Sequence, residues 1–413
     1  MTNTIAEKYS DAAFAIGTQL CRSAFGHGDR CNWIGLDWNE KKRKATVDSL
    51  GYTFYEGTSG IAFFLSQLYQ TTGEEIFKQT AVQALNQAYR FSKKYPGNHP
   101  LSFYFGKGGL LYSLMLAAGL LNEPALIKKA KSVAEDILKL KNSKPQFDIT
   151  IGVAGTIPVL LQAFEKLEMP ELKTHAIYWG NYLIDHSVIE KKNCRAWKSP
   201  SGNRTPLTGF AHGASGIGYA LAVLWKYSGE NKYLEAANEA FRYDDLFFNT
   251  EKNNWLDLRN SDSTNKKKQK NEKQYMTAWC YGASGIGMAR LAAYRISAND
   301  GLKLMAQKAC IAAAESLNST VNFSLCHGSF GTAELLLQYS RFSNDDKIIQ
   351  SLNQVAEKGI KEYFSEDIPW LCGTPDGSYS PAFMNGVAGI GNFYLRMSSE
   401  KKIASGLILE EIL

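Results

Sequence analysis

The sequence predicts an all-α protein in which seven helical hairpins close into one ring. A glycine-rich turn recurs seven times along the 413 residues, and the turns are followed by apolar segments with helical spacing. A more polar segment with the same period usually comes next. Strand-type alternation is scarce, so each unit is predicted to pair an inner apolar helix with an outer amphipathic helix.

The seven turns share two glycines that are three residues apart, and their first glycines are Gly57, Gly106, Gly152, Gly213, Gly282, Gly328 and Gly386. The steps between them are 46 to 69 residues, which is long for a solenoid and indicates loops inserted between the hairpins. Closure of the ring would bring all the turns to one end. We expect the backbone N–H groups of the inner helix starts to face one cavity there and to favour anionic groups.

The apolar and polar segments alternate in chain order. Residues 216–228, GIGYALAVLWKYS, are typical of an inner helix, and residues 231–248, NKYLEAANEAFRYDDLFF, are typical of an outer one. No Pro/Ser-rich linker divides the chain, so we expect one domain over residues 1–413, with residues 1–50 as a helical lead-in. Residues 261–273 contain five lysines and no apolar side chain, which predicts a flexible loop. This loop is either a solvated insert or a contact for an acidic peptide.

Composition and charge exclude several classes of protein. The net charge of +6 is mild for this length and does not demand a nucleic-acid partner. No apolar run reaches the roughly 18–20 residues of a membrane span, and the N-terminus lacks the pattern of a secretory signal. We therefore expect a cytoplasmic protein. The odd number of cysteines, seven, argues against a disulfide framework and favours free thiols, some of them metal ligands.

Cysteines and histidines stand at matching places directly before three of the turns. Cysteine and histidine are the usual ligands of tetrahedral zinc, and a catalytic zinc site keeps one position open. Cys280, Cys326 and His327 therefore predict a zinc site if adjacent hairpins bring them together. The alternative is a pair of buried structural cysteines and a histidine that caps a helix.

The segments GFAHGASGIG, AWCYGASGIG, SLCHGSFG and NGVAGIG resemble the LanC-like lanthionine cyclases. The resemblance covers nearly the whole chain, and the pair WCYG and CHG is specific to that family. The segments NWIGL and TFYEGTSGIAFFLSQLY are similar to the start of the cyclase domain in class II lanthipeptide synthetases. The resemblance implies an α/α toroid of seven helical hairpins with one zinc ion, Zn2+, bound at one end.

The resemblance also implies particular site residues, which are Cys280, Cys326 and His327 as zinc ligands and His212, Asp148 and Tyr281 as catalytic residues. Asp148 would either hold His212 or take the proton of the substrate thiol. Helix capping is the alternative role for Asp148 and His212, and packing is the alternative for Tyr281. Some relatives carry an arginine four residues before the first zinc cysteine. Met276 stands at that place here, so the role of that arginine is either absent or filled by another residue.

The implied reaction adds a peptide cysteine to dehydroalanine or dehydrobutyrine and forms lanthionine or methyllanthionine. The zinc would lower the pKa of the substrate thiol, and the thiolate would add to the β-carbon of the dehydro residue. His212 would then protonate the enolate at Cα. The resemblance leaves two arrangements open, a stand-alone cyclase or the cyclase half of a bifunctional synthetase. The implied partners are a dehydrated precursor peptide with its leader and, for a stand-alone cyclase, a separate dehydratase, in the cytoplasm or peripheral to a membrane-bound biosynthetic complex.

Two other functions compete with the cyclase. A LanC-like scaffold that binds a peptide or glutathione without cyclase activity would need no open zinc site. A terpene cyclase with an α/α toroid would need aspartate-rich clusters for magnesium and diphosphate. The pairs Asp244-Asp245 and Asp345-Asp346 lack the further aspartate that such a motif requires.

Overall fold

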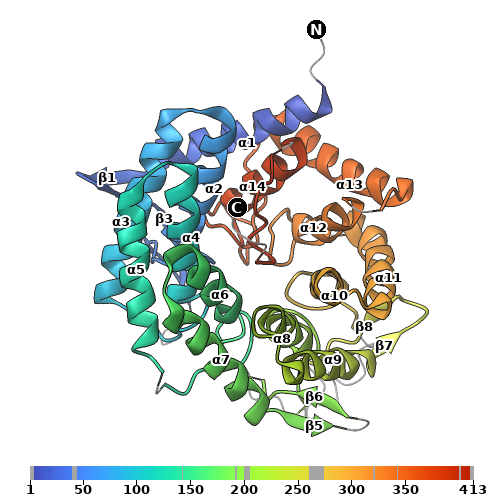
Figure 1. The fold of residues 1–413 in the computed structure, drawn as a ribbon. Helices are drawn as coiled ribbons and strands as arrows, with labels where there is room; N and C mark the ends of the chain where they lie inside the picture. The colour runs from blue at the N-terminus through green and yellow to red at the C-terminus, as the bar shows by residue number, and fades with distance from the viewer. Residues whose placement is uncertain are drawn as a thin grey trace.

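The computed structural model describes residues 4–39, 44–141, 143–190, 193–199, 205–259, 274–319, 321–341, 343–399 and 401–409. The predicted basic loop at 261–273 lies outside these ranges. Figure 1 shows two concentric layers of helices around an axis, with the C-terminal end of the chain near the centre. The predicted α/α toroid is therefore confirmed.

The inner layer consists of the helices that follow the glycine turns: α2 (Thr58–Thr72), α4 (Lys107–Leu120), α6 (Thr156–Leu167), α8 (Ala214–Ser228), α10 (Ala283–Ser297), α12 (Ser329–Ser340) and α14 (Val387–Ser398). The outer layer consists of α1 (Ile5–Ser23), α3 (Glu75–Lys94), α5 (Pro124–Leu138), α7 (Pro170–Asp185), α9 (Asn231–Asp245), α11 (Asp300–Ser316) and α13 (Asp346–Gly359). The inner helices are buried on nearly all sides, whereas the outer helices bury one stripe, as their amphipathic sequences predict.

The first helix closes the ring. α1 packs on α14, so the seventh hairpin joins the two ends of the chain, as Figure 1 shows. Its start is fixed by a capping box, in which Thr4 and Glu7 exchange side-chain-to-backbone hydrogen bonds. The remainder of the predicted lead-in at residues 1–50 is not helical within the described part. It forms two antiparallel hairpins, β1 (Phe25–His27) with β2 (Arg30–Asn32) and β3 (Ile34–Asn39) with β4 (Lys44–Ser49).

Short elements also follow the outer helices. Two further hairpins pair β5 (Val188–Glu190) with β6 (Cys194–Ala196) and β7 (Phe248–Asn249) with β8 (Asn254–Trp255). A 3-10 turn, η1 (Leu317–Ser319), and a π turn, η2 (Ile360–Phe364), extend α11 and α13. These pieces lengthen the connections between hairpins, in agreement with the long steps between the turns.

Each glycine turn closes the same backbone loop. The residue after the first glycine donates its N–H to the carbonyl seven positions earlier, at 2.8–3.3 Å, in Thr58–Gly51, Lys107–Pro100, Val153–Gln146, Ala214–Leu207, Ala283–Met276, Ser329–Asn322 and Val387–Ser380. These donors are therefore satisfied within their own loops. The prediction that they face a cavity and favour anions is wrong, because the loop uses them first.

The glycines are required because backbone passes very close to them. At Gly282, φ is +86° and an added Cβ would lie 1.6 Å from the carbonyl oxygen of Met276. At Gly285, an added Cβ would lie 2.0 Å from the carbonyl oxygen of Trp279. Only glycine leaves space for both contacts, which explains the repeated spacing of three.

The loops that precede the glycine turns pack against one another at one end of the ring. The residue three positions before each first glycine is apolar and buried, and this set comprises Phe54, Phe103, Ile149, Phe210, Trp279, Leu325 and Phe383. The next position joins neighbouring loops by backbone hydrogen bonds from Thr150 to Ala211, Ala211 to Cys280, Cys280 to Cys326, Cys326 to Met384, Met384 to Tyr55 and Tyr55 to Tyr104, at 2.9–3.3 Å. Side chains from different turns therefore meet at this end of the ring.

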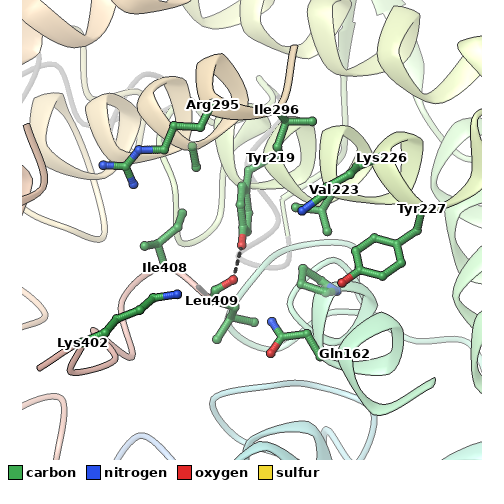
Figure 2. A pocket seen from close by; sticks show the side chains of 12 residues that line it. Gln162, Tyr219, Val223, Lys226, Tyr227, Arg295, Ile296, Lys402, Ile408 and Leu409 are labelled. Carbon is green, nitrogen blue, oxygen red and sulfur yellow. Dashed lines mark hydrogen bonds between the residues drawn. The ribbon is translucent and has the colours of Figure 1, made fainter. Parts of the chain in front are cut away.

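The C-terminal segment 401–409 fills the axis beneath these loops. Tyr104 Oη donates to the carbonyl of Gly406 at 2.9 Å, and Trp279 Nε1 donates to that of Leu407 at 3.0 Å. A cavity of about 380 Å³ lies beside this segment and is lined by residues of α6, α8 and α10 (Figure 2). In the part of the chain that is described, no helix is long and apolar enough to cross a membrane.

Candidate metal and acid–base site

Cys280 and Cys326 meet at the turn end of the ring. Both stand two positions before the first glycine of their turns, and Cys280 N donates to the carbonyl of Cys326 at 3.3 Å. A side-chain hydrogen bond also joins the two thiols. Cys326 is 6% exposed, whereas Cys280 is half-buried and so faces the opening. The neighbouring hairpins thus place two sulfur atoms together.

The two thiols have opposite electrostatic properties. The hydrogen bond from Cys326 lowers the pKa of Cys280, and the charges of Arg259 and His212 add to this effect. The same hydrogen bond and burial raise the pKa of Cys326 well above its ordinary value. Cys280 therefore ionises more readily than Cys326, and the thiolate is the form of sulfur that reacts and binds metal.

His327 follows Cys326 but its ring does not join the sulfur pair. The ring makes a hydrogen bond with the backbone of Gly373, and desolvation lowers its pKa although the residue remains exposed. Within the described ranges, no three side chains of His, Cys, Asp or Glu converge closely enough to hold a metal ion. Cys280 and Cys326 supply two sulfur donors of the kind that zinc takes, and His327 would have to turn away from Gly373 to become a third ligand.

His212 and Asp148 form a hydrogen-bonded pair beside the cysteines. His212 Nδ1 lies 3.0 Å from Asp148 Oδ2, and Asp148 is only 2% exposed. Burial lowers the pKa of His212, but the hydrogen bond and charge of Asp148 outweigh burial and raise the pKa above its ordinary value. Thr150 Oγ1 lies 3.0 Å from the same ring nitrogen and 3.1 Å from Asp148 Oδ1. Asp148 and Thr150 together fix the orientation of the His212 ring.

Of the two residues that could cap a helix or turn, Asp148 does so and His212 does not. Asp148 Oδ1 accepts the backbone N–H groups of Ile151 at 2.7 Å and Gly152 at 3.1 Å, so Asp148 does cap its turn. Its second oxygen nevertheless holds His212. The start of α8, at Gly213, receives no side-chain capping hydrogen bond, so His212 does not cap that helix.

Tyr281 lies between the acid–base pair and a cation. Its ring centroid is 5.9 Å from that of His212, and the guanidinium of Arg259 lies 3.9 Å from the Tyr281 ring centroid. Burial raises the pKa of Tyr281 well above its ordinary value, so the phenol stays protonated. Sequence reasoning missed Arg259. Its position in Asp257-Leu258-Arg259, just before the basic loop, gave no motif to single it out.

Tyr55 is a second residue that sequence reasoning missed. Its hydroxyl makes a side-chain hydrogen bond with Cys326 and donates to Asn385 Oδ1 at 3.3 Å. Tyr55 stands two positions before the first glycine of its turn, the same register position as Cys280 and Cys326. That register was the signal that could have found it. All seven cysteines are free, as predicted.

The fold and the site define a class of protein, an α/α toroid whose turns carry a cysteine pair and a histidine–aspartate pair at one end. The profile of the lanthionine synthetase C-like proteins matches residues 48–408. Because this match spans most of its length, the chain belongs to the lanthionine synthetase C-like family.

The chain is also similar to one curated protein and to several solved structures. The chain is 23% identical over 395 residues to the lacticin 481/lactococcin biosynthesis protein LcnDR2 of Lactococcus lactis subsp. lactis, covering 90% of this chain and 38% of that protein. Nisin cyclase has a TM-score of 0.67 at 18% identity, covering 96% of this chain and 97% of that one. A GH76 alpha-mannanase of Bacteroides thetaiotaomicron has a TM-score of 0.51 at 8% identity, covering 96% of each chain. At these identities the structural likenesses show the toroid alone.

Proposed function

We propose that this protein is a zinc-dependent lanthionine cyclase. The observation that supports the proposal most strongly is the joint placement of the Cys280–Cys326 thiol pair and the Asp148–His212 pair at one end of the ring. The proposed substrate is a dehydrated precursor peptide with its leader. A separate dehydratase would supply it, because the reaction consumes dehydroalanine or dehydrobutyrine.

In this proposal, Cys280, Cys326 and His327 hold the zinc ion. When bound, zinc would lower the pKa of a substrate thiol and keep the sulfur nucleophilic near neutral pH. The hydrogen bond between the two protein thiols lowers the pKa of Cys280 and so favours the thiolate form that metal binding requires.

The protein's own residues would handle the proton. The peptide thiolate adds to the β-carbon of the dehydro residue, and the electron pair of the double bond moves toward Cα and its carbonyl. His212 gives a proton to Cα through Nε2, because Asp148 binds Nδ1 and fixes the ring. Tyr281 forms a wall beside His212 and limits where the peptide can lie.

A second function is favoured by one specific observation. The ring of His327 points to Gly373 and leaves the sulfur pair without a third ligand among the described residues. A LanC-like scaffold that binds a peptide or glutathione would need no third ligand. The two functions differ in whether a dehydrated peptide loses free thiols when the protein is added.

The test is a cyclisation assay with a synthetic dehydrated peptide that contains free cysteines. Because cyclisation conserves mass, the remaining thiols are counted by alkylation and mass spectrometry. We expect the wild-type protein with zinc to remove alkylatable thiols, and His212→Ala to be about 100-fold slower or worse, as expected for loss of an acid–base group. A wild-type protein that leaves the thiols at the background rate would instead indicate the binding scaffold.

A further inference from the structure

Arg259 contacts the aromatic ring of Tyr281, the residue that follows Cys280. Its guanidinium is 3.9 Å from the centroid of the Tyr281 ring, which is within the range of a cation–π contact. Tyr281 directly follows Cys280, so this contact places a permanent positive charge against the residue adjacent to the first cysteine. Arg259 remains charged at every working pH.

Hydrogen bonds with Asp257 fix the orientation of the Arg259 side chain. Nε lies 3.1 Å from Asp257 Oδ1, and Nη2 lies 2.6 Å from Asp257 Oδ2, which is a two-bond fork. The side chain of Asp257 is 3% exposed, so this anchor is rigid, whereas that of Arg259 is 38% exposed. Nη2 also lies 2.6 Å from Met276 Sδ. A buried carboxylate therefore holds the guanidinium, while part of the Arg259 side chain remains accessible to solvent.

Tyr281 links Arg259 to the histidine of the site. The ring of Tyr281 contacts the guanidinium of Arg259, 3.9 Å from its centroid, and its centroid is 5.9 Å from that of the His212 ring. A cation this close to His212 is placed where a reaction on a bound peptide would develop negative charge.

We propose that Arg259 is a catalytic residue that binds the carbonyl oxygen of the dehydro residue and stabilises the negative charge formed there. This inference rests on the proposed cyclase function. Arg259 thereby supplies a positive charge that Met276 cannot supply. The contact between Arg259 Nη2 and Met276 Sδ shows that the ends of the two side chains are adjacent.

The step is balanced without any further reactant. A C–S bond forms between the peptide thiolate and the β-carbon, and the carbon–carbon π bond breaks. Its electron pair moves onto Cα and the carbonyl oxygen, which carries the negative charge that Arg259 would bind. Protonation at Cα by His212 restores the carbonyl, and the thiol proton is returned to His212 through the solvent.

The test compares Arg259→Met with the wild-type protein, using kcat for the dehydrated peptide, zinc content and Tm. We expect kcat to fall about 100-fold, the usual effect of losing one donor to a developing oxyanion. Zinc content should stay unchanged. Arg90→Met is the matched control, because Arg90 is an exposed arginine on α3 that pairs with Asp29, far along the chain from the site.

A second variant separates charge from structure. In Arg259→Met combined with Met276→Arg, the arginine is moved to the other side chain of the same contact. We expect this swap to recover at least about tenfold of the kcat lost in Arg259→Met. A purely structural role would not be recovered, since the swap leaves the Asp257 fork broken. If Arg259→Met has a lowered Tm, Arg259→Gln replaces it in the comparison.

The outcomes separate this inference from the function on which it rests. An inactive zinc-loaded wild-type protein would overturn the cyclase function, and this inference with it. An active wild-type protein with Arg259→Met within threefold of its kcat would overturn the inference alone. A swap no faster than Arg259→Met would also overturn it, because charge would then not be the cause of the loss.

Discussion

Asp148 controls both the position and the charge of His212. Burial by itself lowers the pKa of His212, whereas the hydrogen bond and charge of Asp148, followed by the smaller effect of the Cys280 charge, raise it. In Asp148→Asn the pKa of His212 should therefore fall, and the protonated acid should be lost at a lower pH. We expect the descending limb of the kcat–pH profile to move to lower pH, with kcat at pH 8 reduced by roughly 10-fold or more.

The measurement is kcat from pH 5 to pH 9 for the wild-type protein and Asp148→Asn, each with zinc content determined on the same sample. Equal zinc content excludes a loss of the metal as the cause. A descending limb at the same pH in both proteins would contradict the role assigned to Asp148.

Asp244 is a buried acid that makes the stability of the fold depend on pH. It lies at the end of α9, where Oδ2 accepts Ser215 Oγ at 2.5 Å and Gly209 N at 3.3 Å. Oδ1 accepts no hydrogen bond from any described residue. Burial raises the pKa of Asp244 to about 7, so the folded protein holds a proton that the unfolded chain releases near pH 4.

Between these two pKa values the folded state binds one more proton than the unfolded state, so stability falls as pH rises from about 4 to about 7. The free energy of unfolding should lose roughly 2–4 kcal/mol over this range through Asp244. Asp244→Asn should remove this loss. Urea unfolding at pH 5 and pH 7.5 tests it, and an identical pH dependence of the two proteins would show that Asp244 is ionised in the fold.

At the scale of one element, the turn before α10 depends on glycine. Gly282→Ala would place a methyl group against the Met276 carbonyl and force alanine into positive φ. We expect a loss of at least about 2 kcal/mol in the free energy of unfolding from backbone strain. The distance between Cys280 and Cys326 should also change, because the same loop carries Cys280.

Gly119→Ala is the matched control for this prediction. Gly119 lies in α4, and an added Cβ there meets nothing within 4 Å. Alanine should stabilise that helix by about 0.5–1 kcal/mol. The free energy of unfolding of both variants is measured by urea unfolding. A Gly282→Ala protein as stable as Gly119→Ala would contradict the close approach of the Met276 carbonyl to Gly282.

The inner helices could be predicted from the sequence because apolar spacing and the glycine turns both specify them. The strands β1 to β4 could not, because each is short and lacks a clear alternation of apolar residues. Nor could the sequence show that α1 pairs with α14, since that contact joins the two ends of the chain. The ring was predicted, but not the residues that close it.

The site was predictable to the extent that it follows the repeat. Cys280 and Cys326 occupy one register position, so a closed ring must bring them together. The direction of the His327 ring is a choice of side-chain rotamer that spacing does not determine. Arg259 lies in a connection outside the repeat, and only the folded contact with Tyr281 reveals it.

At the scale of the whole molecule, the site exists only in the closed ring. Asp148, His212, Cys280 and Cys326 come from four successive turns and are joined by backbone hydrogen bonds between their loops. A ligand that binds these loops together should therefore stabilise the entire fold. Zinc at about 100 times its Kd would contribute about 2.7 kcal/mol to the free energy of unfolding.

Chelation tests this coupling. We expect Tm to fall by several degrees when a chelator removes zinc, and to recover when zinc is returned. Cys280→Ala should have the lower Tm from the start and should not respond to the chelator. A Tm of the wild-type protein that is unchanged by chelation would mean that zinc does not link these loops.

The central claim is most directly tested by the metal content of the purified protein, measured by elemental analysis for wild type and Cys280→Ala. The account predicts about one zinc ion per wild-type chain and almost none in Cys280→Ala, because two thiolates and one imidazole are the minimal protein ligands of an open site. A carefully purified wild-type protein that contains no zinc and takes up none would contradict the account, and would leave a toroid whose paired cysteines serve binding.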